Sequence, residues 1–501
     1  MPKRAATLPL ALPPREFGVA ASQWLSSAIR SEILEGRLRP GGRLPATRDL
    51  ARQYALSRGT VVSAFDRLRA EGYVEAGVGS GTYVSRVLPD DLLHVSRRPL
   101  ARAPVAGTPR RRLSRFGRRI RPFPGYSFGA LRAFRTDQPA LDLFPADLWA
   151  KVASRRLRRV TTRLLYGSPP LGYPPLQEAV AAYLGASRGV RCRPDQIAII
   201  SGVQEALDLT ARLLLEPGDR VCIESPGYVG AVLAFEAAGA RVTPVPVDGE
   251  GMTAPPPRFR SVRLAYVTPG HQFPLGVCMS LRRRLAVLEW ARATGAMVFE
   301  DDYDSEYRYA GRPLPSLQGL DRHGLVLFAG SFSKVLFPAI RLGYLLVPPD
   351  LVDRFAAVKS VASRHAPLLD QAVLCDFITE GHFGRHVRRM REIYAERRAV
   401  LLDAAREQLG GLLEIVGVEA GLQTAGRLGE GLDGATAAKA AAARDVEVTP
   451  LSRYAFGRQV PEGLQLGFAA VDAAEIRRGV RDLAAALEPL RARPAHGGVP
   501  A

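Results

Sequence analysis

Lys334 constrains the fold and the chemistry of this chain more than any other single residue. The chain has 69 lysine and arginine residues, and only five of them are lysines. Lys334 stands in Ser-Phe-Ser-Lys-Val-Leu-Phe-Pro-Ala-Ile-Arg-Leu-Gly, residues 331–343, between apolar runs at 325–329 and 342–347. Arginine keeps its proton near neutral pH, whereas a desolvated lysine amine can lose it and form a Schiff base with an aldehyde. We therefore expect a reactive lysine at a strand-to-loop junction; an ordinary surface lysine is the alternative.

Groups suited to phosphate binding accompany this lysine. Ser331, Ser333 and Arg341 offer hydroxyls and a guanidinium, which hold a phosphate through charge-assisted hydrogen bonds. Upstream, an apolar strand at 196–200 runs into a glycine turn and the start of a helix, whose free amides and dipole favour an anion. The sequence predicts that this turn completes the phosphate site, with groups from Gly202, Val203 and Gln204.

A cluster of carboxylates follows another strand. Residues 296–299 are apolar and lead into Glu-Asp-Asp-Tyr-Asp-Ser-Glu, residues 300–306. Ligands of open α/β sheets bind at the carboxyl ends of the strands. A carboxylate there can pair with a protonated pyridine nitrogen, so we assign that role to Asp301 and make Tyr303 a donor to the ring's phenolic oxygen. A Mg²⁺ site is the alternative, because acidic runs also bind that ion.

Two further residues are candidates with an ordinary structural alternative. Tyr228, in Ser-Pro-Gly-Tyr, can stack on the ring of a cofactor or be a core or loop tyrosine. His271, in Pro-Gly-His-Gln-Phe-Pro, can serve the cofactor or be structural.

The alternation of elements predicts an α/β fold. Short apolar strands alternate with helical stretches from residue 196 to 347, which indicates a parallel sheet. A second, helical and mixed region follows Pro348. We expect helices at 386–402 and 472–487, and strand positions at 421–423 and 464–469.

The first 86 residues predict a small separate module. Apolar periodicity indicates a helix at 22–35, a second helix that opens at Leu44, and a third that Ser57 caps. Residues 72–84 predict a β-hairpin with a glycine-rich tip. A capped helix with arginine and threonine at its start suits entry into a DNA major groove, although three helices and a hairpin also suit a protein-interaction module.

Charge supports a nucleic-acid partner. The formal net charge is +20, and the isoelectric point is near 10.3. Residues 87–135 are rich in arginine, and no acidic residue occurs between His94 and Thr136. We expect an extended, poorly packed linker there, which either contacts DNA phosphates or is a solvated tether.

Cysteine usage and the N-terminus predict a cytoplasmic protein. The four cysteines have no metal-ligand spacing, and a reduced setting fits them. The N-terminal apolar stretch is too short and too broken by proline for a signal peptide, and no apolar run reaches membrane-spanning length.

Several of these blocks resemble one known family. The acidic block at 300–306 and the Ser-Phe-Ser-Lys…Arg-Leu-Gly block resemble the fold-type I aminotransferase-like domain of the MocR subfamily of GntR transcriptional regulators. Arg-Leu-Pro-Ala-Thr-Arg-Asp-Leu-Ala, Leu-Ser-Arg-Gly-Thr-Val and Gly-Ser-Gly-Thr-Tyr-Val resemble the GntR winged helix-turn-helix. The likeness runs from about Arg15 to Leu490. Phe273 stands where general aminotransferases carry asparagine, and MocR-like domains share this form.

The resemblance implies a three-part chain of the α/β class. Residues 15–86 would form a winged helix-turn-helix and 87–135 a basic linker. Residues 136–490 would form a domain that binds pyridoxal 5′-phosphate (PLP), comprising a large fold-type I part and a smaller C-terminal α+β part. Lys334 would form the internal aldimine, with the cofactor partners already named. The residues expected to contact DNA are Arg48, Arg58 and Thr60, with Arg43, Gly79 and Gly81 as weaker candidates.

The family implies a dimeric, PLP-dependent regulator that binds double-stranded operator DNA. It would sense PLP or an amino compound and control vitamin B6 or amino-acid metabolism. Gln465 falls where aminotransferases hold the substrate carboxylate with arginine, which favours PLP itself as effector. The alternatives are an active aminotransferase with an appended DNA-binding module, and a DNA-binding protein with a degenerate, PLP-free domain.

Overall fold

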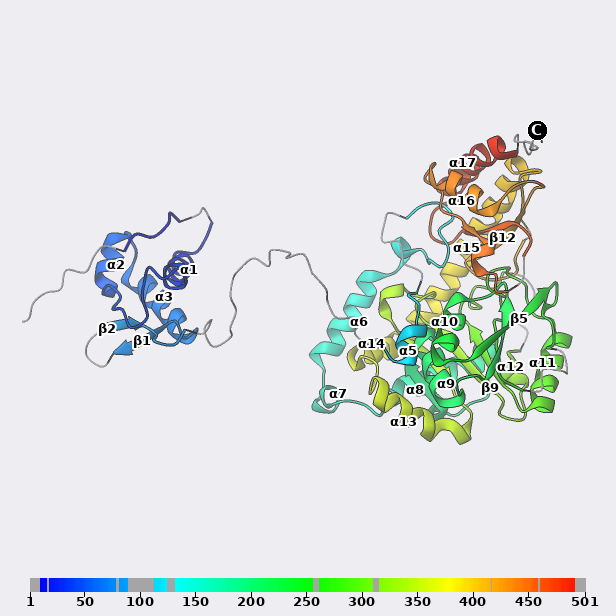
Figure 1. Ribbon diagram of the computed structural model, residues 1–501, viewed down its shortest axis with the longest axis horizontal. Coiled ribbons are helices and arrows are strands. Elements are labelled where there is room, and N and C mark those ends of the chain that lie inside the picture. The colour runs from blue at the N-terminus through cyan, green and yellow to red at the C-terminus, as the bar shows by residue number, and fades with distance from the viewer. Residues whose placement is uncertain are drawn as a thin grey trace, which may run out of the picture. The chain divides into compact units, whose positions relative to one another are not determined.

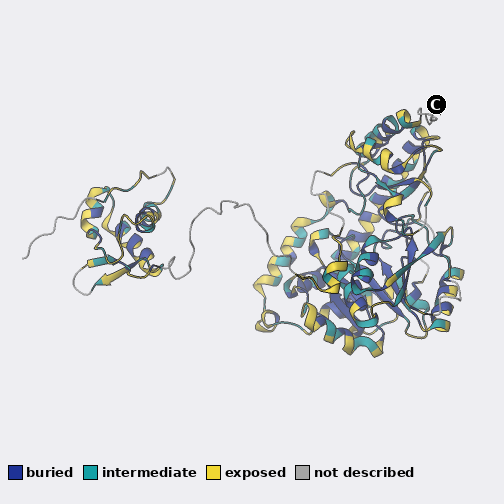
Figure 2. Ribbon diagram, viewed as in Figure 1, coloured by how far each residue is buried: buried dark blue, intermediate teal, exposed yellow. Residues whose placement is uncertain are grey.

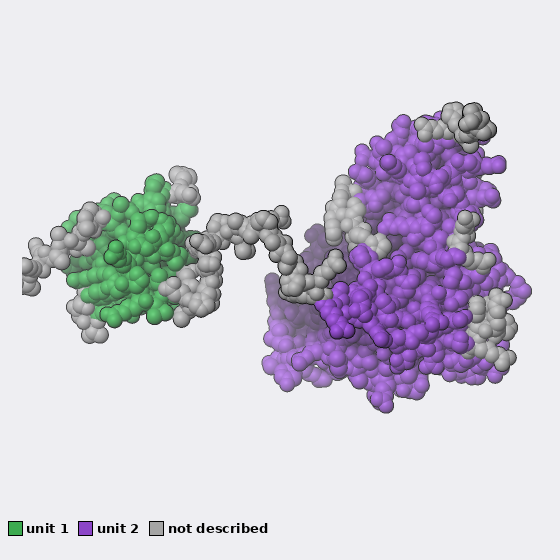
Figure 3. All heavy atoms as spheres, in the orientation of Figure 1, with its two compact units in different colours: residues 1–111 green, residues 112–501 purple. Residues whose placement is uncertain are grey.

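The computed structural model describes residues 10–15, 18–77, 81–88, 112–123, 131–255, 261–309, 315–415, 417–457 and 460–491. The chain divides into two compact units, residues 1–111 and 112–501 (Figure 3). Gly79 and most of the predicted linker lie outside the described residues.

The described residues of unit 1 form three helices and a hairpin (Figure 1). Its elements are α1 (Ala21–Leu34), α2 (Thr47–Gln53), α3 (Arg58–Ala70), β1 (Val74–Gly77) and β2 (Gly81–Val84). The Ser57 hydroxyl accepts a hydrogen bond from the Thr60 amide at 3.0 Å and fixes the start of α3, as predicted. Helix α2 begins at Thr47 and not at Leu44, because a residue before a proline, here Pro45, avoids helical backbone.

Unit 2 is built on a mixed sheet of strand order β3-β10-β9-β8-β7-β4-β5-β6. The strands are β3 (Ile197–Ile200), β4 (Arg220–Ser225), β5 (Arg241–Asp248), β6 (Gly251–Met252), β7 (Val262–Val267), β8 (Met297–Asp302), β9 (Val326–Ser331) and β10 (Gly343–Leu346). The sequence indicated a parallel sheet, and two of its strands depart from that prediction. Strand β10 runs antiparallel to both β3 and β9, and β6 runs antiparallel to β5.

Helices cover both faces of this sheet, whose strands are among the most buried parts of the unit (Figure 2). One face packs on α9 (Val203–Leu214), α10 (Val229–Ala238) and α13 (Val352–Ala362). The other packs on α8 (Pro174–Arg188) and α11 (Leu281–Thr294). The remaining helices of this part are α6 (Ala146–Arg158), α7 (Thr162–Tyr166), α12 (Leu317–Leu320) and α14 (Leu368–Thr379).

A smaller sheet follows, of order β11-β12-β14-β13. It comprises β11 (Leu413–Ile415), β12 (Gln423–Leu428), β13 (Thr449–Pro450) and β14 (Gly463–Gly467), and it is accompanied by α15 (His382–Gln408), α16 (Gly434–Ala442) and α17 (Ala473–Arg491). Helix α15 is longer at both ends than predicted. It starts directly after Gly381, whose φ of 76° lies outside the helical region.

The described part of the linker is not extended throughout, contrary to expectation. Residues Arg115–Arg119 form a short helix, α5, which Ser114 caps and which packs on α10. The Arg119 guanidinium lies over Gly239 at the end of α10, and Arg121 pairs with Glu236. Cations there meet the negative end of the α10 dipole and its last carbonyls.

No helix in the described ranges is long and apolar enough to cross a bilayer.

Two adjacent valines of α3 test the core of unit 1. Val61 is fully buried among the apolar residues of unit 1, whereas Val62 is 40% exposed. Val61→Ala should destabilise the unit by about 2 kcal/mol, because it removes buried methyl groups and leaves a cavity, and Val62→Ala by less than about 0.5 kcal/mol. Hydrogen exchange of the α1 and α3 amides in the full chain measures both changes; equal effects would contradict the packing described.

Candidate functional site

The parallel pairing of β8 and β9 creates the site. Asp301 lies opposite Ala329 in this pairing, so both strands end at the same edge of the sheet. Strand β9 stops at Ser331, and Lys334 follows in the next turn. The structure thus brings the two sequence blocks together at the carboxyl ends of neighbouring strands, where ligands of such sheets bind.

The Lys334 amine meets a residue that the sequence analysis missed. Its Nζ donates to the backbone carbonyl of Asp137 at 2.9 Å and lies 3.1 Å from the Asp137 carboxylate. Asp137 has a φ of 65°, in the left-handed region that favours glycine and tolerates aspartate. The available signal was an acidic residue in a Thr-Asp-Gln-Pro turn directly after a long stretch without acidic residues.

Asp301 is a buried carboxylate with one oxygen unpaired. The Tyr266 hydroxyl donates to Oδ2 at 2.7 Å, while Oδ1 has no hydrogen-bond partner among the described residues. Burial raises the pKa of Asp301 to about 7, although the Tyr266 hydrogen bond opposes this rise. A cation or a protonated nitrogen placed beside Oδ1 would relieve the cost of burying this charge.

The start of α9 and the guanidinium of Arg341 lie side by side. Gly202 caps the helix with a φ of 120°, and a Cβ there would lie 3.2 Å from Arg341 Nη2. The first amides of a helix, here those of Val203 and Gln204, have no partner within it. The Gln204 side chain donates to the carbonyl of Gly230 at 2.9 Å.

Two serines lie close to this group, because Ser331 pairs with Gly343, which also pairs with Ile200 at the end of β3. The Ser333 amide donates to the Ser331 hydroxyl at 3.2 Å, and the buried Ser333 hydroxyl has no partner in the described structure. A phosphate could bind here to the Arg341 guanidinium, the start of α9 beside Gly202 and the Ser333 hydroxyl.

A buried ion pair stabilises the first turn of α9. Glu205 accepts from the Ser201 amide at 2.5 Å and from Lys359 Nζ at 2.7 Å. Lys359 lies on α13 and is fully buried. Burial opposes ionisation of Glu205, but the bonds from Lys359 and Ser201 prevail and lower its pKa. The carboxylate beneath the anion site is therefore neutralised.

Tyr303 and His271 form one hydrogen-bonded group with Asp304. The Tyr303 hydroxyl lies 2.9 Å from His271 Nδ1, and both Asp304 oxygens lie 3.0 Å from the same nitrogen. His271 Nε2 is buried and has no described partner. Burial, and then the charge of Asp304, raise the pKa of the Tyr303 phenol, which therefore remains a protonated donor.

Tyr228 belongs to an aromatic wall beside this group. Its ring stacks near Tyr266 with centroids 6.3 Å apart and meets Phe273 edge-on at 5.9 Å. Phe123, from the linker segment that carries α5, lies 6.3 Å from the Tyr228 ring.

Gln465 lies in the middle of β14, opposite Ala425 of β12, and is fully buried. The Tyr454 hydroxyl donates to its Oε1 at 2.8 Å, whereas its Nε2 has no described partner. A neutral amide donor thus occupies a strand position where we expected an arginine in an aminotransferase.

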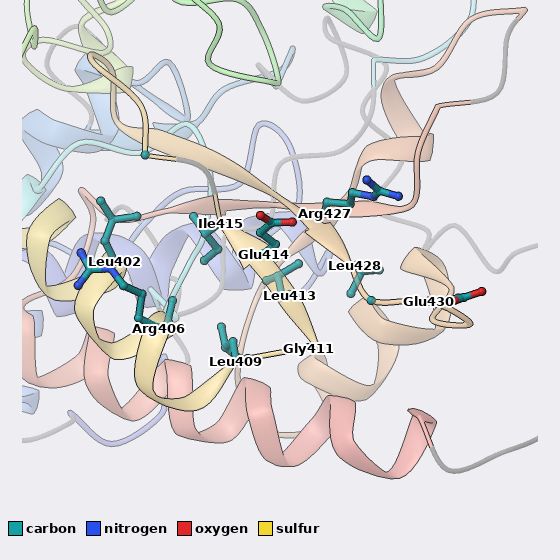
Figure 4. A pocket seen from close by; sticks show the side chains of 14 residues that line it. Leu402, Arg406, Leu409, Gly411, Leu413, Glu414, Ile415, Arg427, Leu428 and Glu430 are labelled. Atoms are coloured by element: carbon teal, nitrogen blue, oxygen red, sulfur yellow. The ribbon is translucent and has the colours of Figure 1, made fainter. Parts of the chain in front are cut away.

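A cavity of about 810 Å³ lies apart from these residues, between the end of α15 and strands β11 and β12 (Figure 4). Leu402, Leu409 and Leu413 line it together with Arg406 and Arg427. No residue of the Lys334 surroundings contributes to its lining, so it is separate from the site.

The residues predicted to contact DNA fall on exposed parts of unit 1. Arg48 is exposed at the start of α2, and Arg58 is exposed at the start of α3. The Thr60 hydroxyl lies 2.8 Å from the Ser57 hydroxyl and thus also takes part in capping. Arg43 lies against Gly81, where a Cβ would be 3.0 Å from its Nε.

Two family models match the chain. Residues 139–483 match "Aminotransferase class I and II", and residues 22–84 match "Bacterial regulatory proteins, gntR family". The probable rhizopine catabolism regulatory protein MocR of Rhizobium meliloti is 40% identical over 474 residues, which cover 94% of either chain. The chain belongs to the MocR-type GntR regulators. The pyridoxine biosynthesis regulator PdxR of Corynebacterium glutamicum is also similar to this MocR-type chain, with 30% identity over 94% of it and 97% of PdxR.

Solved structures similar to the MocR-type chain include aminotransferases. The α-aminoadipate aminotransferase LysN of Thermus thermophilus, complexed with N-(5′-phosphopyridoxyl)-L-leucine, has a TM-score of 0.66 and 31% identity, and covers 72% of this chain and 92% of its own. An archaeal alanine:glyoxylate aminotransferase has a TM-score of 0.67 and 29% identity, with the same coverage. The predicted fold class is confirmed, and this fold implies PLP as the cofactor.

The residues present fit that cofactor. Asp301 Oδ1 and the Ser333 hydroxyl are buried polar atoms without described partners, and Gly202 leaves room beside Arg341. Across the described ranges, no group of three or more His, Cys, Asp or Glu residues is arranged to hold a metal ion.

The raised pKa of Asp301 makes the stability of the cofactor-free protein depend on pH. A folded pKa of about 7 exceeds the ordinary value of 3.8, so the folded state loses stability as pH rises from 3.8 through about 7. Asp301→Asn removes this loss, about 4 kcal/mol at pH 8, of which about 3 kcal/mol falls between pH 5 and pH 8. Asp350→Asn, at an exposed position, does not. Urea unfolding at pH 5 and pH 8 measures the difference. An unchanged pH dependence in Asp301→Asn would contradict the buried, unpaired carboxylate.

Proposed function

We propose that this MocR-type chain is a transcriptional regulator whose unit 2 holds PLP at Lys334 and responds to PLP or to an amino compound. The observation that carries the proposal is that Lys334 and the buried Asp301, whose Oδ1 has no described partner, lie at the same edge of the sheet. The aldehyde of PLP, when bound, supplies reactivity toward amines.

Each neighbouring residue has a defined task in this proposal. Lys334 provides the amine, and Asp301 Oδ1 accepts a hydrogen bond from the protonated ring nitrogen. Tyr303, kept protonated, donates to the phenolic oxygen, and His271 orients Tyr303 through their shared hydrogen bond. Tyr228 covers one face of the ring.

A second group of residues would bind the phosphate. Arg341 and the start of α9 supply the positive potential, and hydroxyls of the serines complete the site. The residues assigned to the phosphate are Ser331, Ser333, Arg341, Gly202, Val203 and Gln204.

Unit 1 binds operator DNA through Arg48, Arg58 and Thr60, supported by Arg43 and Gly81. The regulator acts as a homodimer in the cytoplasm, where chromosomal DNA lies in bacteria. The effector shifts DNA binding only to the extent that it binds one conformation better than the other.

Sustained transamination is disfavoured by Gln465. A neutral amide cannot form the bidentate ion pair with which an arginine holds a substrate carboxylate. The site is thus better suited to detection of a ligand than to turnover of amino acids.

Replacement of Lys334 tests the proposed function. Wild-type protein mixed with PLP should show a visible absorption band that borohydride reduction fixes on Lys334, whereas Lys334→Ala should show neither. PLP should change the affinity for the chain's own promoter DNA by at least about 5-fold in the wild type and not in the variant. Lys151→Ala, at an exposed position on α6, is the matched control and should behave as wild type. A colourless wild-type protein would refute the proposal.

Replacement of Arg58 tests the DNA surface. Arg58→Ala should weaken operator binding and reduce the slope of log affinity against log salt by about one, because one phosphate contact is lost. Arg69→Ala, at the far end of the same helix and paired with Asp66, is the control. Fluorescence anisotropy from about 50 to about 200 mM salt, a range chosen in line with the usual salt dependence, measures both slopes. Equal slopes in the two variants would remove Arg58 from the interface.

A further inference from the structure

The described end of the linker makes three contacts along one helix of unit 2. Arg119, the last residue of α5, lies at the C-terminal end of α10. Arg121 forms an ion pair with Glu236 in the last turns of α10. The Phe123 ring lies 6.3 Å from the ring of Tyr228, the residue directly before α10. The contacts therefore follow α10 from its end to its start.

The length of the segment matches the length of the helix. From Arg119 to Phe123 an extended chain spans at most about 14 Å. Helix α10 has ten residues, which corresponds to about 15 Å. Ile120, which follows α5, has extended backbone with φ −61° and ψ 131°. Residues 119–123 thus run the length of α10 in an extended conformation, antiparallel to the helix.

Tyr228 connects this segment to the proposed cofactor site. Its ring contacts Phe123 of the linker, and it also stacks near Tyr266 of β7 with centroids 6.3 Å apart. The Tyr266 hydroxyl in turn donates to Asp301 Oδ2 at 2.7 Å. Three successive contacts therefore lead from the linker to the carboxylate that we assign to the ring nitrogen.

The docking of the segment is weak enough to be reversible. Helix α5 has five residues, and a helix of that length is not stable without tertiary contacts. Phe123 remains 39% exposed in its docked position. Both partners of the ion pair between Arg121 and Glu236 are more than a third exposed, so the pair contributes little stability. A modest free energy of ligand binding can therefore shift the balance between a docked and a released segment.

We propose that Arg121 and Phe123 are positioning residues of the cofactor site: the docked segment holds Tyr228 in place beside the ring, so that ring binding and docking strengthen each other. The inference rests on the proposed function and adds a means of regulation to the same site.

The direction of the coupling follows from the order that docking creates. A Tyr228 side chain that the linker already holds loses less conformational freedom when a ring binds beside it, so the docked state binds PLP more tightly. By reciprocity, PLP favours docking by the same factor. The linker joins unit 2 to the DNA-binding unit, so release of the segment would lengthen the tether of that unit.

Hydrogen exchange of the full chain without cofactor tests the docking itself. Peptide 113–123 should exchange at least about 3-fold faster in Arg121→Glu than in the wild type, because the substitution replaces an ion pair with two like charges. Arg112→Glu, at an exposed position outside α5, is the charge-matched control and should exchange as the wild type does. Equal exchange in Arg121→Glu and the wild type would overturn the inference.

Titration with PLP tests the coupling, with the visible band as the measure of apparent affinity. Arg121→Glu and Phe123→Ala should each need about 3- to 10-fold more PLP than the wild type, since both release Tyr228. Ile120→Ala, at a more exposed apolar residue of the same segment, should need as much as the wild type. Arg121 pairs with a residue that has no assigned role in the cofactor site, so its effect reaches the ring through docking.

A charge swap and the converse measurement complete the test. The double variant Arg121→Glu, Glu236→Arg should restore the PLP affinity to within about 2-fold of the wild type, because it re-forms the ion pair. In the wild type, PLP should slow the exchange of peptide 113–123 at least about 3-fold. A band of wild-type affinity in Arg121→Glu, or exchange that PLP leaves unchanged, overturns the coupling alone. Absence of the band in the wild type refutes the proposed function and the coupling with it, so the two failures are distinguishable.

Discussion

The parallel pairing of β8 and β9 is the constraint on which the site depends. It brings a buried carboxylate from one strand and a lysine turn from the next to a common edge, although Lys334 lies 33 positions after Asp301 in the sequence. Without a partner for its second oxygen, Asp301 is costly to bury. The unfavourable free energy of burying Asp301 arises where a cationic ring nitrogen would remove it, as expected of a site arranged for a ligand.

Much of this arrangement could be predicted from the sequence because the chemistry lies at strand ends. Apolar runs that end at Phe299 and just before Ser331 place Asp301 and Ser331 at the sheet edge, and the serine cap of α3 is equally local. The resemblance to MocR-type regulators is confirmed by both family models and by a relative with 40% identity. The directions of β10 and β6 could not be predicted, since an apolar run does not encode strand direction.

Contacts between segments far apart in the chain could not be predicted for a different reason. Asp137 lies 197 positions before Lys334, and nothing in its own turn indicates that partner. The docking of α5 on α10 depends likewise on a cation from the linker and on Glu236. An arginine-rich composition predicts a solvated segment, whereas in the structure α5 packs against α10.

The ion pair between Glu205 and Lys359 connects the proposed phosphate site to a residue that does not line it. Lys359 comes from α13, which contributes none of the residues assigned to the cofactor, yet it cancels a negative charge within the first turn of α9. Loss of that lysine would uncover a carboxylate beneath the bound dianion. If α9 binds the phosphate as proposed, the affinity for it would depend on two helices. Substitutions on the buried side of α13 would then change that affinity without altering any group that the ligand touches.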